Sequence, residues 1–201
     1  MRGLAANLAR LTLLLVLVGA GGPSGASAAV FQVRPGGDSK VVFISKAPME
    51  RFEGKTGRLE GTIDVDPAQL GDSATVHFEV DMASLDTGIA KRNQHMRENH
   101  LETAKYPKAV FDGAAIHAAG GASLATGKAT TLDVEGAFTL HGVTRRIRIP
   151  VEVTYKRGAI SFKTTFRVSL ADYAISLPQF LFLKLADTQE VRVSGTAVSA
   201  P

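Results

Sequence analysis

The amino-acid sequence predicts an all-β fold, an antiparallel β-barrel of about eight strands with one helix between two strands. Apolar and polar residues alternate with a period of two along most of the chain, as in strands that bury one face. Glycine-containing turns separate these runs, and one charged segment, residues 88–104, has the composition of a helix. Such strands hide their apolar faces in a closed barrel or a sandwich, and closure also removes unpaired edges.

The first 29 residues are expected to be a signal peptide that is removed from the mature protein. Arg2 and Arg10 supply positive charge, and the apolar run 11–20 follows. A run of about ten residues suits a signal peptide, whereas a membrane span needs roughly 20. A buried N-terminal helix is disfavoured because the run has no polar face. Cleavage is expected after Ala28 or Ala29, which leaves a domain at residues 30–201 that is periplasmic or secreted.

Composition restricts the classes of partner. The chain has no cysteine, so it has neither a disulfide nor a cysteine for lipid anchoring. Its formal net charge is +4 and its pI about 9.5, but the basic residues form no run of five or more. This spread argues against a nucleic-acid-binding stripe. The charge is compatible with transient contact with an anionic membrane surface, and the sequence does not indicate an oligomeric state.

The predicted strands follow one another along the rest of the chain. In residues 75–81 every second residue is apolar, which makes this run the clearest example. The same pattern recurs at residues 41–46, 59–65, 109–117, 132–140, 147–155, 160–168 and 189–198. Tight hairpin turns are expected at His141-Gly142 and Arg157-Gly158, since glycine adopts a positive φ at little cost.

The segment at residues 88–104 predicts a helix of three to four turns that packs over or beside a barrel opening. Its apolar residues at rough helical spacing are Ile89, Met96 and Leu101. Thr87 is expected to cap the helix by accepting free backbone N–H groups. Pro107 follows the segment and ends it.

Two residues of this helix are candidates for contact with the polar head of a ligand. Arg92 and His95 are three residues apart and share a helix face. They can equally pair with Glu98 and Glu102 at helical spacing. His95 and His100 are five residues apart, which rotates them by about 140° on an α-helix, so they are not expected to share a face.

The inward-facing residues predict either a plain core or a cavity for one apolar ligand. The small inward residues Gly61, Gly136 and Thr164 are expected to leave room in the interior. An apolar cavity favours an alkyl or prenyl chain by about 0.8 kcal/mol for each buried CH₂ group. The candidate ligand-binding residues are Phe43, Ile63, Phe78, Val80, Phe111, Val134, Phe138, Ile149, Val151, Phe162, Phe166, Phe180 and Phe182.

One stretch does not follow the alternation. Residues 177–185 are apolar on both parities. The stretch either plugs or lines one mouth of the barrel, or forms an ordinary buried strand that starts at Pro178.

No pattern in the sequence predicts catalysis. The five histidines are scattered, cysteine is absent, and the metalloprotease motif HExxH does not occur. The nucleophile motif GxSxG and a phosphate-binding loop are also missing. We therefore expect neither enzymatic activity nor a cofactor nor a metal. The alternative to a ligand carrier is an extracytoplasmic interaction or stress protein with a filled barrel and no bound lipid.

Residues 84–96, Ser-Leu-Asp-Thr-Gly-Ile-Ala-Lys-Arg-Asn-Gln-His-Met, resemble the YceI-like family of exported lipid- or polyisoprenoid-binding proteins. Residues 52–63 resemble the early hairpin of that family, and residues 101–111, which contain Tyr-Pro and a phenylalanine, its passage from helix to strand. Residues 140–144, Leu-His-Gly-Val-Thr, resemble its late hairpin. These stretches occur in the family's order along nearly the whole predicted mature chain.

The resemblance implies a lipocalin-like extended barrel with a helix between two strands. It also implies an amphiphilic lipid in the interior, namely a polyisoprenoid, an isoprenoid quinone or a fatty-acid derivative. Members are typically periplasmic or secreted, and no catalytic residues come with the resemblance. Residues 177–185 differ from the polar, glycine-containing loop that many members have at this place.

Overall fold

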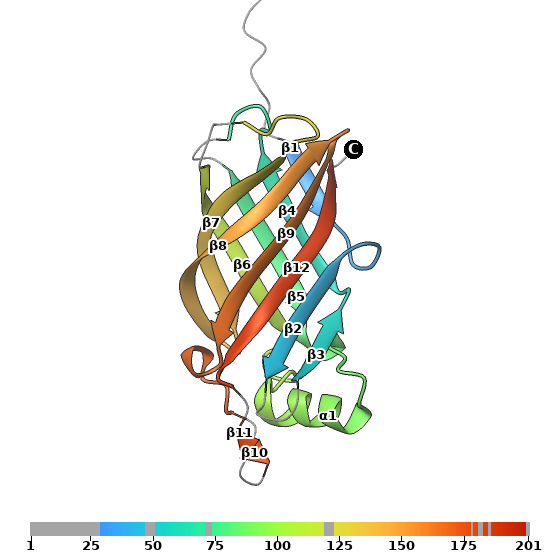
Figure 1. Ribbon diagram of the computed structural model, residues 1–201, viewed down its shortest axis with the longest axis vertical. Coiled ribbons are helices and arrows are strands. Elements are labelled where there is room, and N and C mark those ends of the chain that lie inside the picture. Colours follow the sequence, from blue (N-terminus) through green and yellow to red (C-terminus); the bar gives the residue numbers. More distant parts are fainter. Residues whose placement is uncertain are drawn as a thin grey trace, which may run out of the picture.

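The computed structural model describes residues 29–46, 51–70, 74–118, 123–177, 179–180, 183–184 and 186–199. Nearly all of the predicted signal peptide lies outside these residues, so its assignment remains a prediction. The described chain forms a long antiparallel barrel with a helix across its lower end (Figure 1). The barrel strands are β1 (Ala29–Val33), β2 (Lys40–Lys46), β3 (Arg51–Thr56), β4 (Leu59–Val65), β5 (Thr75–Asp81), β6 (Lys108–Ala118), β7 (Ala129–Leu140), β8 (Val143–Lys156), β9 (Ala159–Ser169) and β12 (Thr188–Ser199).

Closure of the barrel depends on β12. The strand order is β1-β4-β5-β6-β7-β8-β9-β12-β2-β3, and β1 also pairs with β12. Along its length β12 pairs with β9 on one side, and on the other side with β2 and then, near its end, with β1. The consecutive strands β1 and β2 therefore share one barrel position, and β3 and β4 share another. The described strands thus fill eight positions, which confirms the predicted barrel.

The two predicted hairpin turns are confirmed. His141 and Gly142 have φ values of 51° and 74°, and Arg157 and Gly158 have values of 53° and 73°. Positive φ at both central residues matches the right-handed twist of the flanking strands.

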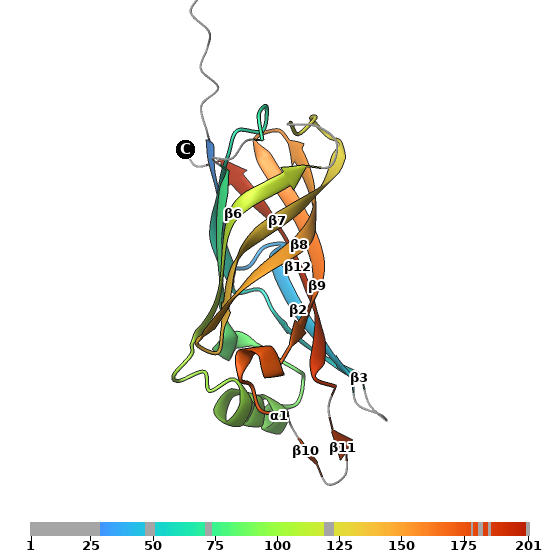
Figure 2. The same ribbon diagram turned by 90° about the vertical axis from the view of Figure 1, so that its left-hand side faces the viewer.

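The helical segment is shorter than predicted and changes type along its length. The α-helix α1 (Ala90–His95) continues directly into a π-helix, η2 (Met96–His100). Short 3₁₀ helices, η1 (Met82–Ser84) and η3 (Ala171–Tyr173), lie in the connections, and η3 lies at the same end of the barrel as α1 (Figure 2). No helix within the described part of the chain combines the length and the apolar composition needed to cross a bilayer.

The predicted role of Thr87 as a helix cap is wrong. The residue at the cap position is Ile89, which makes no side-chain hydrogen bond to the helix. Thr87 instead donates from its backbone N–H and its hydroxyl to Oδ1 of Asn93, at 2.8 and 2.7 Å. Asn93 in turn donates to Asp86, which also accepts from the N–H of Gly88. Gly88 has a φ of 80°, and this turn directs Thr87 toward Asn93 rather than toward the first helical N–H groups.

The stretch 177–185 does not form a barrel strand. Its described parts, β10 (Gln179–Phe180) and β11 (Leu183–Lys184), form a separate two-stranded sheet. This hairpin projects beyond the end of the barrel that carries α1 (Figure 1). The side chains of Phe180 and Phe182 lie outside the described residues, so their predicted ligand contacts remain predictions.

Three inward-facing phenylalanines lie across from a glycine on the neighbouring strand. The register pairs are Phe43 with Gly54, Phe78 with Gly61, and Phe162 with Gly195. A Cβ atom on Gly54 would lie 2.1 Å from the ring of Phe43, and one on Gly61 would lie 2.6 Å from the ring of Phe78. Each ring therefore lies over the space that a side chain on the opposing glycine would fill.

The prediction that Gly61 and Gly136 leave room in the interior is wrong. Neither glycine lines the cavity, although Thr164 does. A Cβ on Gly136 would lie 2.3 Å from the carbonyl oxygen of Asp112, where a β-bulge between Gly113 and Ala115 shifts the register of β6. Gly61 allows close approach of the Phe78 ring, and Gly136 allows close approach of the neighbouring backbone. The empty volume of the cavity lies away from both glycines.

We expect Gly136→Ala to destabilise the barrel by about 1–3 kcal/mol, because its Cβ meets the backbone of the bulged strand. Urea denaturation measures this change as a lower midpoint at an unchanged slope. Gly195→Ala is the graded control and should cost less, because its Cβ would lie 3.1 Å from the nearest atom, a ring carbon of Phe162 that can shift, and the loss of glycine's flexibility offsets part of the strain. Equal effects of the two substitutions would contradict this explanation.

Candidate ligand-binding site

The barrel encloses a cavity of about 1370 Å³. This volume exceeds the range of about 300–1,000 Å³ that is usual for small-ligand pockets. Every described residue that the sequence predicted for ligand contact lines it. These residues are Phe43, Ile63, Phe78, Val80, Phe111, Val134, Phe138, Ile149, Val151, Phe162 and Phe166, together with Arg92 and His95.

Aromatic rings from strands that are not neighbours in the sheet contact one another inside the barrel. The rings of Phe78 and Phe162 have centroids 5.2 Å apart, and those of Phe138 and Phe166 are 6.0 Å apart in an edge-to-face arrangement. Because β5 and β9 lie four positions apart in the eight-position barrel, the contact of Phe78 with Phe162 crosses the interior, and the cavity is the space that these rings leave around them. The aliphatic side chains between them are too short to fill the remaining space, and the result is a long apolar cavity.

Apart from Thr164, the polar lining residues gather at one end of this cavity. The helix contributes Lys91, Arg92, His95 and His100, and the adjoining strand ends contribute Ser45 of β2 and Gln189 of β12. The sequence predicted Arg92 and His95 but missed the other four and the aromatic residue Phe52, which also lines the cavity. For Ser45 and Gln189 a signal was present, because they share the inward parity of Phe43 and Val191.

Arg92 is held against the cavity wall by the segment that precedes the helix. Its Nε donates to the hydroxyl of Thr87 and its Nη2 to the carbonyl of Thr87, both at 2.9 Å. Its guanidinium lies 4.2 Å from the centroid of the Phe52 ring, a cation–π contact. Of the two carboxylates suggested as partners for Arg92 and His95, Glu98 accepts from Gln94 and Glu102 contacts His141.

The expectation that His95 and His100 lie on different faces is wrong. Nε2 of His100 lies 3.2 Å from Nδ1 of His95, and the ring centroids are 4.9 Å apart. The expectation assumed 3.6 residues per turn. In the π-helix the N–H of Leu101 bonds to the carbonyl of Met96, five residues earlier, and this wider turn brings residues five apart together.

The hydrogen bonds of the two histidines indicate their tautomers. Nδ1 of His100 lies 3.0 Å from the carbonyl oxygen of Ser176, which can only accept, so Nδ1 carries the proton. Nε2 of a neutral His100 must then accept from Nδ1 of His95. Burial of the His100 imidazole lowers its pKa, which favours this neutral state. The hydrogen bond between His100 and the carbonyl of Ser176 also connects the helix to the segment that follows η3.

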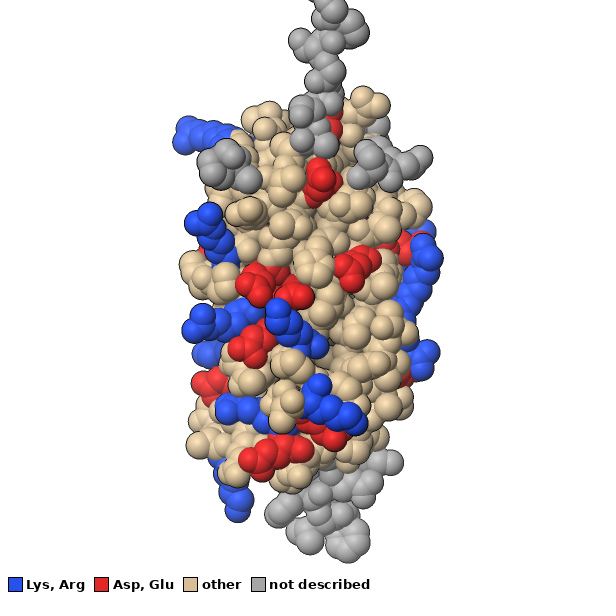
Figure 3. All heavy atoms as spheres, turned by 180° about the vertical axis from the view of Figure 1, so that it is seen from behind, with Lys and Arg blue, Asp and Glu red and all other residues tan. Residues whose placement is uncertain are grey.

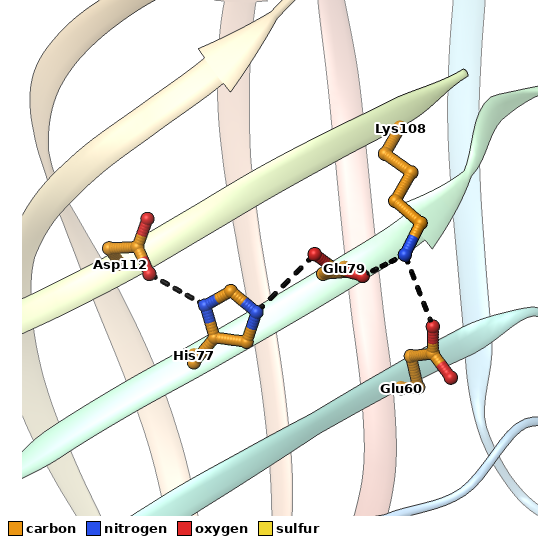
Figure 4. Close-up of polar contacts among 5 residues, drawn as sticks. All are labelled: Glu60, His77, Glu79, Lys108 and Asp112. Atoms are coloured by element: carbon orange, nitrogen blue, oxygen red, sulfur yellow. Dashed lines mark hydrogen bonds and ion pairs between the residues drawn. The ribbon is translucent and has the colours of Figure 1, made fainter.

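A second polar network lies on the outside of the barrel and not in the cavity (Figure 4). Nδ1 of His77 lies 2.6 Å from Asp112, and its Nε2 lies 3.5 Å from Glu79. Lys108 contacts both Glu79 and Glu60, so the network connects β4, β5 and β6. The hydrogen bond to Asp112 is the main cause that raises the pKa of His77, and the bond to Lys108 is the main cause that lowers the pKa of Glu79.

This network belongs to a surface of mixed charge. Acidic and basic side chains are interspersed over the back of the barrel (Figure 3). Exposed ion pairs of this kind contribute little to stability, about 0–1 kcal/mol each. Among the described residues, no group of three or more His, Cys, Asp or Glu side chains is arranged to hold a metal ion.

Residues 31–197 match the sequence profile of the YceI-like domain. A UPF0312 protein of Vibrio parahaemolyticus is 31% identical over 162 residues, which cover 76% of this chain and 81% of the relative. A UPF0312 protein of Pseudomonas syringae pv. tomato is 32% identical over 129 residues, 59% of this chain and 61% of the relative.

Solved structures share the fold. A polyisoprenoid binding domain from Saccharophagus degradans aligns with a TM-score of 0.68 at 20% identity, over 87% of this chain and all of the other. Burkholderia cenocepacia BcnA aligns with a TM-score of 0.68 at 22% identity, over 80% of this chain and 96% of the other. At these identities the likeness establishes the barrel architecture.

We expect His77 and His100 to influence stability in opposite directions as pH changes. The raised pKa of His77 means that this side chain's contribution to the free energy of unfolding is complete below about pH 6.5. That contribution is lost as pH rises through the folded-state pKa. The lowered pKa of His100 means that this side chain's contribution to the free energy of unfolding is present above about pH 6.5. That contribution is lost as pH falls through the folded-state pKa.

Thermal unfolding of His77→Gln and His100→Gln between about pH 5 and about pH 8 tests this expectation. Relative to the unsubstituted protein, His77→Gln loses most stability at the acid end, by no more than about 1 kcal/mol because the side chain is 46% exposed. His100→Gln loses most at the alkaline end. Profiles that run parallel to that of the unsubstituted protein would show that neither histidine is coupled to folding.

Proposed function

The chain belongs to the YceI-like family, and we propose that it is an exported, non-enzymatic binding protein that holds an amphiphilic lipid in its barrel. The proposed ligand is a polyisoprenoid, an isoprenoid quinone or a fatty-acid derivative. The observation that carries the proposal is the cavity of about 1370 Å³, which is apolar along its length and polar at one end. An amphiphile with a long tail and a small head has the same distribution of polarity.

The energetics favour a hydrocarbon tail. Each CH₂ group removed from water contributes about 0.8 kcal/mol, so a five-carbon isoprene unit contributes about 4 kcal/mol before the costs of ordering the chain. The apolar wall offers such a tail contacts without leaving polar groups unpaired. A long barrel interior suits an extended chain better than a globular ligand.

Sequence features and one relative support the finer parts of the proposal. The positively charged start, the apolar run 11–20 and the small residues at 26–29 favour export to the periplasm or beyond. The S. degradans domain is described as polyisoprenoid-binding, and we extend that ligand class to this chain as part of the proposal. The alternative of a filled barrel requires inward side chains that occupy the interior, whereas these side chains leave it open.

The first test is chemical identification of the cargo. We expect organic extraction of the gently purified protein, followed by mass spectrometry, to release an apolar lipid at a ratio near one per chain. Protein stripped of lipid should take up added geranylgeraniol, a twenty-carbon isoprenoid alcohol. Failure of both retention and uptake would contradict the proposal.

The second test fills the cavity. Thr164 lines the cavity, whereas the next residue, Thr165, is exposed on the outer surface. We expect Thr164→Phe to lower geranylgeraniol binding about tenfold or more, because a ring in the interior displaces several CH₂ groups of the tail. Thr165→Phe is the matched control and should bind like the unsubstituted protein. Equal binding by both variants would place the ligand outside the barrel.

A further inference from the structure

We propose that the end of the barrel that carries α1 docks on the surface of an anionic phospholipid bilayer, with the cavity mouth turned toward the lipid. The inference rests on the proposed function only in that a bilayer is the source or destination of the carried lipid. Docking itself is a property of the outer surface, and it is measured independently of cargo.

The first observation concerns exposed apolar side chains. Ile89 is 51% exposed and also lines the cavity, so it lies on the rim where the apolar wall reaches the surface. The other large apolar side chains in the described residues with comparable exposure are Val30 and Val198. They belong to β1 and to the end of β12, at the opposite end of the barrel from α1 (Figure 1).

The second observation is the charge around the mouth. Lys91 is exposed, lines the cavity and forms no hydrogen bond or ion pair with another described residue. No Asp or Glu among the described residues lines the cavity. The carboxylates nearby do not line the cavity: Asp86 accepts from Gly88 and Asn93, Glu98 accepts from Gln94, and Glu102 contacts His141. The rim therefore combines an apolar side chain with an available cation.

The third observation is the placement of the β10–β11 hairpin. It projects beyond the barrel at the same end as α1 in both ribbon views (Figures 1 and 2). Its described residues, Gln179, Phe180, Leu183 and Lys184, include one lysine and no acidic residue. In the register of the hairpin Phe180 pairs with Leu183, and no described residue of the barrel strands pairs with it.

Together these features match the chemistry of a membrane interface. Segments that bind there present apolar residues for the acyl boundary and basic residues for lipid phosphates. An anionic surface attracts each nearby lysine and repels carboxylates, and the described lining of the cavity has basic side chains but no carboxylate. A bilayer against this end would also let a hydrocarbon tail pass into the cavity with little exposure to water.

Flotation of the full-length mature protein with vesicles tests the inference. We expect the protein to bind vesicles of phosphatidylglycerol mixed with phosphatidylcholine, and to bind pure phosphatidylcholine vesicles weakly. Lys91→Glu should lower partitioning into the anionic vesicles about fivefold or more, because each basic side chain near such a surface favours binding. Ile89→Ser should lower binding to both kinds of vesicle. Raising the salt to about 0.5 M should weaken binding by screening.

Val198→Ser is the matched control for Ile89→Ser, since it removes an equally exposed apolar side chain at the opposite end. It should leave vesicle binding unchanged. Thr164→Phe, which blocks the cavity, should also bind vesicles normally, so loss of cargo binding and loss of docking are distinguishable. No binding to anionic vesicles, or binding that depends on Val198 and not on Ile89 and Lys91, would overturn the proposal.

Discussion

Phenylalanine rings that lie over glycines of the neighbouring strand are the constraint on which the rest of the structure depends. Phe43, Phe78 and Phe162 each face such a glycine in the ladder register. A ring in this position occupies the space that a side chain on the glycine would fill, and the rings of Phe78 and Phe162 also contact each other across the interior. The same arrangement allows strands to approach closely where the barrel coils. The same phenylalanines therefore belong to the packed interior and line the cavity that remains beside them.

The polar end of the cavity depends on a different set of interactions. Asn93 is buried and connects the loop at Thr87 to the first turn of the helix, and Thr87 in turn orients Arg92. His100 then ties the last turn to the carbonyl of Ser176. The helix is thus fixed at both ends across the mouth. Its polar side chains reach the rim as a consequence of these ties.

The two ends of the barrel consequently have different surfaces. At the α1 end the apolar interior, the cationic rim and the β10–β11 hairpin lie together. On the outer wall, charges of both signs are paired across strands, as in the network around His77. A wall of paired charges remains in water at little cost, because its groups stay solvated. The division between a solvated wall and a partly apolar end is the basis of the docking orientation that we propose.

The sequence by itself determined the strands, their inward faces and the hairpin turns, because a period of two and glycine at positive φ are local properties of the chain. It also placed Phe138, Ile149 and the other described residues predicted for ligand contact on the inner wall. Only the tertiary structure decided whether side chains fill the barrel interior, since the empty volume depends on how the rings are oriented in the folded barrel. The same holds for His95 and His100, whose contact requires a π-helix, and for Thr87, whose partner is set by the turn at Gly88. Local patterns specify which face is inward, whereas distances across the barrel and the type of helix follow from long-range packing.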